Sequence, residues 1–160
     1  MSALHAFENQ MANATDEDPS RWPEKQITRK SITALSQITD LLDQVIEVME
    51  RVGYAVSDRF AVRLALDEAI VNALKHGHDH DPRKRVRIWW AVTESAVKLA
   101  VQDEGRGFDP ALVPDPCLAE NLERPCGRGL LLIKSYMTWV RFNRRGNCIA
   151  MCLFRSHKTG

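Results

Sequence analysis

Apolar residues recur every three or four positions in two consecutive stretches, which predicts two amphipathic helices. The first stretch runs from Leu35 to Val52, and Gly53 closes it. The second runs from Ser57 to Gly77, with Ser57 suited to the N-cap and Gly77 typical of a C-terminal stop. Because only residues 54–56 separate the stretches, we expect the two helices to be neighbours on one side of a sheet.

Strict alternation of apolar and polar positions predicts strands in the rest of the chain. Residues 86–92 and 97–102 alternate in this way around a short turn, so they should form a hairpin. A second hairpin is predicted for Trp139–Asn143 and Asn147–Phe154. Its last strand is apolar on both faces, which favours a central position in the sheet. The β-branched segment Lys25–Ala34 predicts an edge strand.

One long segment has neither period. Residues 110–125 contain four prolines, and a loop of this length in a compact domain favours a functional lid. A short helix over Leu130–Met137 should follow, beginning near Gly129. The order β, α, α, β, β, lid, α, β, β predicts an α+β fold, an α/β sandwich with helices on one face of a mostly antiparallel mixed sheet.

Length and composition limit the organisation of the chain. With 160 residues it fits one domain, for which we expect residues 25–160 preceded by a mobile tail over residues 1–24. The formal net charge of +1 shows no bias toward nucleic acid or an anionic membrane. No apolar run approaches the ~20 residues of a membrane helix, and the N-terminus lacks a signal peptide. These features predict a cytoplasmic protein that binds neither nucleic acid nor membrane.

The four cysteines show neither zinc-ligand spacing nor a disulfide framework, so free thiols are expected. Cys148 and Cys152 should lie on the same face of the last strand. Cysteine at such positions commonly behaves as a small buried hydrophobe.

The second helix carries the first candidate site residues. At 3.6 residues per turn Glu68, Asn72 and Lys75 fall on one stripe. Most polar stripes on helices are simply solvated faces, so a functional interpretation needs support from elsewhere in the chain.

Two glycine-bearing segments give that support. Asp103 stands at the end of a predicted strand, and Gly105 and Gly107 follow it, allowing positive φ and close approach of a ligand to the backbone. The segment Gly127–Leu130 opens a predicted helix, whose free N–H groups could receive phosphate oxygens. Neither segment is a Rossmann fingerprint, and the chain has no Walker motif.

Together, and in this order, these residues resemble the GHKL (Bergerat-fold) ATP-binding superfamily. Glu68 and Asn72 match its N-box, in which a glutamate precedes an asparagine by four residues. Asp103, Gly105 and Gly107 match its first glycine box, D-x-G-x-G. Gly127 and Gly129 match the second, G-x-G. The short lid and the stretch L-E-R-P-C-G-R-G-L resemble the bacterial anti-sigma-factor serine/threonine kinases, the histidine-kinase-like branch without further domains.

The resemblance implies a Bergerat fold that binds ATP and Mg²⁺, with roles for particular residues. Asn72 would bind Mg²⁺ through its side-chain oxygen, and Asp103 would accept a hydrogen bond from the adenine amino group. Glu68 would be the general base for attack on the γ-phosphate, and Lys75 could neutralise phosphate. The remaining members of the implied nucleotide site are Gly105, Gly107, Gly127, Arg128, Gly129 and Leu130.

The implied function is an anti-sigma factor with serine/threonine protein kinase activity. Its partners would be a small STAS-type anti-sigma-factor antagonist, a sigma factor and a second copy of the chain. Two alternatives stay open: a non-catalytic, nucleotide-gated module that sequesters a regulator, and a simple ATPase. A metal site at His76, His78 and His80 is a further alternative. No cysteine or further histidine stands nearby to complete it, and we interpret this loop as solvated.

Overall fold

A computed structural model describes Pro19 and residues 27–78, 81–107 and 128–156, and these residues form two layers, a sheet and a set of helices. The five strands are β1 (Thr28–Ile32), β2 (Val86–Val92), β3 (Ala96–Gln102), β4 (Trp139–Phe142) and β5 (Cys148–Phe154). They lie in the order β1-β2-β3-β5-β4. All four neighbouring pairs are antiparallel, so the described strands include no parallel pair.

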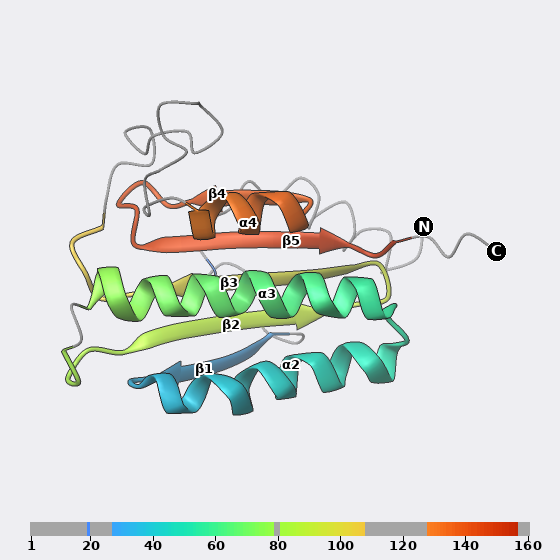
Figure 1. The fold of residues 1–160 in the computed structure, drawn as a ribbon, viewed down its shortest axis with the longest axis horizontal. Coiled ribbons are helices and arrows are strands. Elements are labelled where there is room, and N and C mark those ends of the chain that lie inside the picture. Colours follow the sequence, from blue (N-terminus) through green and yellow to red (C-terminus); the bar gives the residue numbers. More distant parts are fainter. Residues whose placement is uncertain (1–18, 20–26, 79–80, 108–127, 157–160) are drawn as a thin grey trace.

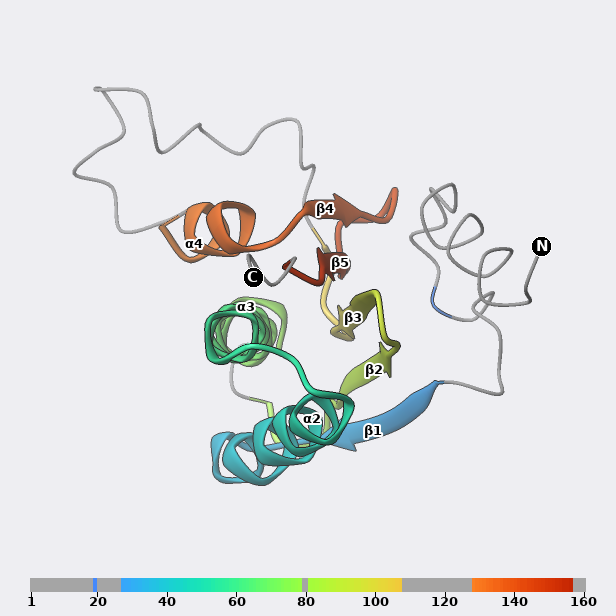
Figure 2. The same ribbon diagram turned by 90° about the vertical axis from the view of Figure 1, so that its right-hand side faces the viewer.

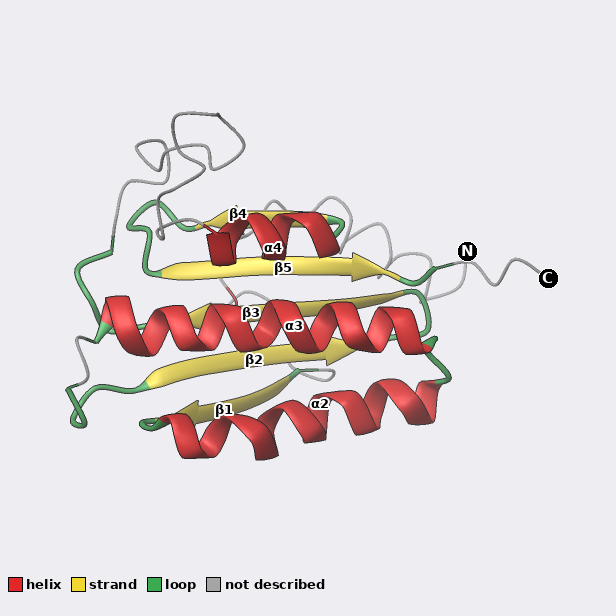
Figure 3. Cartoon of the chain, viewed as in Figure 1, coloured by secondary structure: helices red, strands yellow, loops and turns green. Residues whose placement is uncertain are grey.

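The helices α2 (Ile38–Val52), α3 (Val56–Asn72) and α4 (Arg128–Tyr136) all cover the same face of the sheet. The predicted α+β class and the one-sided helix layer are therefore confirmed, and Figure 3 shows the two layers by element type. No helix in the described ranges is both long and apolar enough to span a membrane. The predicted lid at 110–125 lies outside the described residues, as does the predicted tail apart from Pro19.

The interior position predicted for the last strand is confirmed, because β5 lies between β3 and β4. Its side chains divide between two apolar clusters. Ile149, Met151 and Leu153 belong to the main core, whereas Cys148 and Ala150 belong to a smaller cluster with Ala100. A strand that is buried on both faces needs apolar residues at every position, which is the pattern seen in the sequence.

The first helix, α2, begins at Ile38, three residues after the start of the apolar pattern at Leu35. A 3₁₀ turn at Leu35–Gln37 precedes α2, and the side chain of Leu35 is 49% exposed. The helix then buries Ile38, Leu41, Leu42, Val45 and Met49. Gly53 ends it in a left-handed conformation with φ of 89°, as predicted.

The second helix begins two residues earlier than an N-cap at Ser57 predicts, and Ser57 is not its N-cap. Ala55 takes that position with an extended backbone and no side-chain hydrogen bond. Ser57 therefore lies inside the first turn, where its hydroxyl cannot cap the helix. Asp58 in the same turn is buried and accepts hydrogen bonds from the backbone N–H and hydroxyl of Ser156, at 3.1 and 3.0 Å.

The C-terminal end of this helix changes pitch. Residues Ala73–Gly77 form a π-helical segment, η4, which continues directly from α3. Gly77 is the last helical residue as predicted, but the next residue, His78, is right-handed with φ of −104°. The helix thus ends without the left-handed glycine on which the prediction was based. Segments of π-helix are rare and occur frequently at functional sites.

Candidate functional site

Glu68 and Asn72 lie one turn apart on α3, where the first turn of α4 packs against them. A Cβ atom at Gly129 would lie 2.6 Å from Glu68 Oε2 and 3.2 Å from Asn72 Nδ2. A side chain at this position would require the carboxylate of Glu68 to move aside. The structure therefore brings together three of the predicted site residues from two helices that are neighbours in space (Figure 1).

The local electrostatics favour this arrangement. Glu68 and Asn72 are both half-buried. The N-terminus of a helix carries partial positive charge and unpaired N–H groups, so a carboxylate nearby is stabilised. A phosphate group would be attracted to the same helix end for the same reasons.

Asp103 is held from two sides at the end of β3. Its carboxylate Oδ1 accepts a hydrogen bond from the backbone N–H of Gly105 at 2.7 Å. Its backbone N–H donates to the Asn147 carbonyl oxygen at 2.9 Å, and its carbonyl accepts from Asn147 Nδ2 at 3.1 Å. The carboxylate thus has a defined position in the turn after β3. Hydrogen bonds to Asn147 hold this turn against the residue that precedes β5.

The turn after β3 packs closely against η4 at two glycines, Gly77 and Gly105. A Cβ atom at Gly77 would overlap the carboxyl carbon of Asp103, and one at Gly105 would overlap the carbonyl oxygen of Gly77. Side chains at these positions would force the helix end and the turn apart. The close approach predicted for this glycine motif therefore occurs within the protein itself.

The predicted positive φ applies to one of the two glycines of this motif. Gly107 has φ of 77°, whereas Gly105 is not among the positive-φ glycines of the described residues. A side chain at Gly105 is excluded by the packing described above. The expectation that both glycines supply left-handed backbone is wrong for Gly105.

The surroundings of Asp103 alter its titration. Burial raises the pKa of this carboxyl above its ordinary value, against the opposing effects of the Gly105 N–H and of electrostatic interactions with His78, Lys84 and Arg145. A carboxylate that has lost part of its water gains more from a hydrogen-bond donor than an exposed one does. Asp103 is therefore well suited to accept a hydrogen bond from an exocyclic amine.

His78 is buried, so the interpretation of the H-x-H-x-H loop as solvated is wrong at this position. Its exposed fraction is 1%, and its Nε2 accepts a hydrogen bond from the backbone N–H of Glu104 at 2.9 Å. His76 is exposed, and His80 lies outside the described residues. Within the described ranges no group of three or more His, Cys, Asp or Glu side chains could hold a metal ion. Apart from its position directly after Gly77, no local pattern indicates that His78 is buried.

The other predicted site residues have varied positions. Lys75 lies in η4 and is exposed, and Arg128 is the exposed first residue of α4. Leu130 is half-buried and packs against the main core. Gly127 lies outside the described residues.

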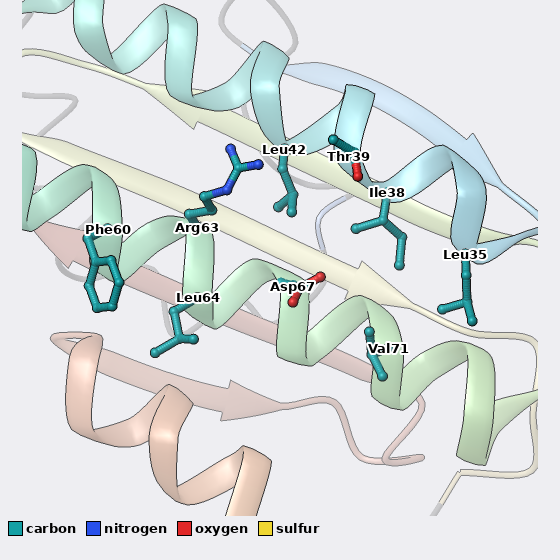
Figure 4. A pocket seen from close by; sticks show the side chains of 9 residues that line it. All are labelled: Leu35, Ile38, Thr39, Leu42, Phe60, Arg63, Leu64, Asp67 and Val71. Atoms are coloured by element: carbon teal, nitrogen blue, oxygen red, sulfur yellow. The ribbon is translucent and has the colours of Figure 1, made fainter.

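A groove of about 450 Å³ lies elsewhere, between α2 and α3. Figure 4 shows that its lining is mostly apolar, with Thr39, Arg63 and Asp67 as polar members. Arg63 is engaged by Asp43 at 2.8 Å. None of the predicted site residues lines this groove, so it is separate from the candidate site.

An antiparallel sheet with helices on one face, an acid–amide pair on one helix, and glycine-bearing turns at a strand end and a helix start define a Bergerat-type nucleotide-binding domain. A sequence model of the histidine kinase-like ATPase domain matches residues 33–153. The chain therefore belongs to the histidine kinase-like ATPase domain family.

Similar proteins lie in the serine kinase branch of this family. The serine/threonine-protein kinase BtrW of Bordetella bronchiseptica is 29% identical over 117 residues, which cover 72% of this chain and 82% of that protein. The serine-protein kinase RsbW of Bacillus subtilis is 32% identical over 111 residues, covering 65% of this chain and 69% of that protein. At the level of the family, these relatives support a kinase with an anti-sigma role.

A solved structure confirms the fold. The RsbU and RsbW domains of Rv1364c from Mycobacterium tuberculosis superpose with a TM-score of 0.51 at 18% sequence identity. The match covers 80% of this chain and 32% of that chain. At this identity the likeness extends to the fold alone.

The residues present fit the ATP that the family implies. Asp103 offers a fixed, half-buried carboxylate for the adenine amine, and α4 begins with a glycine turn beside Glu68 and Asn72. Mg²⁺ prefers a few protein oxygens combined with phosphate and water, so one amide oxygen from Asn72 is a suitable contribution.

Proposed function

We propose that this protein is an ATP- and Mg²⁺-dependent serine/threonine protein kinase that acts as an anti-sigma factor. Its acceptor is a serine or threonine of a small STAS-type antagonist, and a sigma factor is its second partner. The proposal places this activity in the cytoplasm, with a second copy of the chain as a candidate subunit. The observation that carries it is the approach of Gly129 to both Glu68 and Asn72.

The adenine end of the proposed site is the turn after β3. Asp103 accepts the hydrogen bond from the adenine amine, while the N–H of Gly105 holds its Oδ1 in place. Gly107 continues the turn in the left-handed conformation. Desolvation of the carboxyl strengthens this interaction and disfavours bases that present an acceptor at the same position.

The phosphate end is formed by α3 and α4. The oxygen of Asn72 contributes one ligand to Mg²⁺, and the N-terminal turn of α4, which begins at Arg128, faces the phosphates. Lys75 and Arg128 are exposed cations that add positive charge near this end. Bound Mg-ATP supplies a γ-phosphoryl group whose negative charge is partly neutralised by the ion.

Glu68 is the proposed general base. It accepts the proton of the acceptor hydroxyl as the new oxygen–phosphorus bond forms and the bond to the bridging oxygen of ADP breaks. Its position one turn before Asn72 supports this role, since the base and the metal ligand then serve the same phosphoryl group.

The test is transfer of label from radioactive ATP with Mg²⁺ to a purified STAS-type antagonist from the same organism. Label on a serine or threonine of the antagonist supports the kinase. A stable, nucleotide-dependent complex that never acquires label would favour the non-catalytic binding module. Release of phosphate without labelled protein would favour a simple ATPase.

A further inference from the structure

We propose that His78 is a positioning residue of the adenine-binding turn, which it holds through the hydrogen bond from Glu104. The inference rests on the proposed function for its consequence in nucleotide binding. Its structural part rests on the contact alone: the buried Nε2 of His78 lies 2.9 Å from the backbone nitrogen of Glu104, which is 26 residues away in the chain.

Three consecutive residues of this turn are each held by a hydrogen bond. Asp103 is held by Asn147, Glu104 by His78, and Gly105 by the carboxylate of Asp103. Of these three hydrogen bonds, only the one between Glu104 and His78 has a partner from the helix side of the site. His78 follows η4 directly, so it links the helix that carries Glu68 and Asn72 to the turn that carries Asp103.

The contact determines the tautomer of the ring. Because Nε2 accepts a hydrogen bond, the neutral imidazole must carry its hydrogen on Nδ1. Nδ1 is buried and has no hydrogen-bond partner among the described residues. A buried N–H without a partner is unusual and costs free energy. The same ring orientation that leaves Nδ1 without a partner allows Nε2 to accept the hydrogen bond from the Glu104 N–H.

Two substitutions separate positioning from general stability. His78→Leu removes the acceptor, whereas His78→Gln keeps an acceptor oxygen at a similar reach. Calorimetry with Mg-ADP should show about tenfold weaker binding for His78→Leu and near wild-type binding for His78→Gln, as expected for loss of one buried hydrogen bond.

Amide exchange of Glu104, measured by NMR without nucleotide, tests the structural part. Exchange should be faster in His78→Leu and slow again in His78→Gln. Equal exchange in all three proteins, or equal Mg-ADP affinity in the two variants, would overturn the proposal. A wild-type protein that binds no adenine nucleotide would instead defeat the proposed function, and the exchange comparison would still decide whether His78 orders the turn.

Discussion

Gly129 at the start of α4 approaches Glu68 on α3 so closely that a Cβ atom there would lie 2.6 Å from the carboxylate oxygen Oε2. The two residues are 61 positions apart in the sequence, and they belong to motifs that seem unrelated when each is considered alone. Their contact joins the proposed general base to the proposed phosphate-binding helix end. A methyl group at position 129 would therefore displace the carboxylate of Glu68.

Gly129→Ala should displace the carboxylate of Glu68 while leaving the protein folded. The added methyl group would meet Oε2, the far end of a flexible side chain that can move aside. We therefore expect the free energy of unfolding, measured by urea denaturation, to change by no more than about 1 kcal/mol, the difference in helix propensity between glycine and alanine. Phosphotransfer should fall, because the proposed base is moved from its position. Lys134→Ala, at an exposed position of the same helix, is the control and should leave transfer unchanged. Wild-type transfer in Gly129→Ala would contradict the proposed position of Glu68.

Asn72→Ala should weaken the Mg²⁺-dependent part of ATP binding, because it removes the amide oxygen proposed as a ligand. Calorimetry with Mg²⁺ and with a chelator separates the two parts. The variant should lose most of the difference between the two conditions and keep the affinity measured with the chelator. Gln44→Ala, exposed on α2, is the control. Unchanged Mg²⁺ dependence in Asn72→Ala would exclude this residue as the ligand.

Asp103→Asn should stabilise the nucleotide-free protein as the pH rises from about 4 to 7. Burial raises the pKa of Asp103 above its ordinary value of 3.8, so the folded state binds its proton more tightly than the unfolded state. The resulting stability is present below the unfolded-state pKa and is lost as the pH rises through the folded-state pKa. Asparagine does not ionise, so the variant does not lose this stability as the pH rises. Its side-chain oxygen can still accept the hydrogen bond from the Gly105 N–H. The same variant should bind ATP more weakly.

Asp81→Asn is a control with the opposite sign. Hydrogen bonds from Arg83 lower the pKa of Asp81 to about 2, so its contribution to stability is present above the unfolded-state pKa and is lost as the pH falls. Urea titrations of both variants at several pH values should therefore diverge from the wild type in opposite directions. Parallel curves would mean that Asp103 is not desolvated.

Cys152 should react slowly with alkylating agents in the folded protein. Burial raises the pKa of its thiol to about 12, so the reactive thiolate is scarce at neutral and mildly basic pH. Mass spectrometry after timed alkylation locates the labelled cysteines. Labelling of Cys152 should require denaturant. Rapid labelling of the folded protein would contradict the interior position of β5.

The elements that could be predicted from the sequence are those governed by local periodicity. The helix around Val45, both hairpins and the interior position of β5 follow from apolar spacing over a few turns or strands. The acid–amide pair at Glu68 and Asn72 and the strand-end position of Asp103 were predictable in the same way. Their placement relative to one another rested on the family resemblance.

The features that escaped prediction depend on contacts between distant residues. The burial of His78 depends on the turn at Glu104, and the glycine requirement at Gly105 depends on the carbonyl of Gly77. The N-cap preference of Ser57 was a sound local signal. It failed because the short link between the two helices starts α3 at Val56. Local propensity could not anticipate any of these three features.

Phosphotransfer by Glu68→Gln is the most direct test of the proposed kinase. Glutamine keeps the shape of the side chain beside Gly129 and removes its ability to accept a proton. Transfer from labelled Mg-ATP to the purified antagonist should fall by on the order of 10²–10⁴, while Mg-ATP affinity stays near that of the wild type. Full transfer activity in Glu68→Gln, with wild-type affinity, would contradict the assignment of Glu68 as the general base.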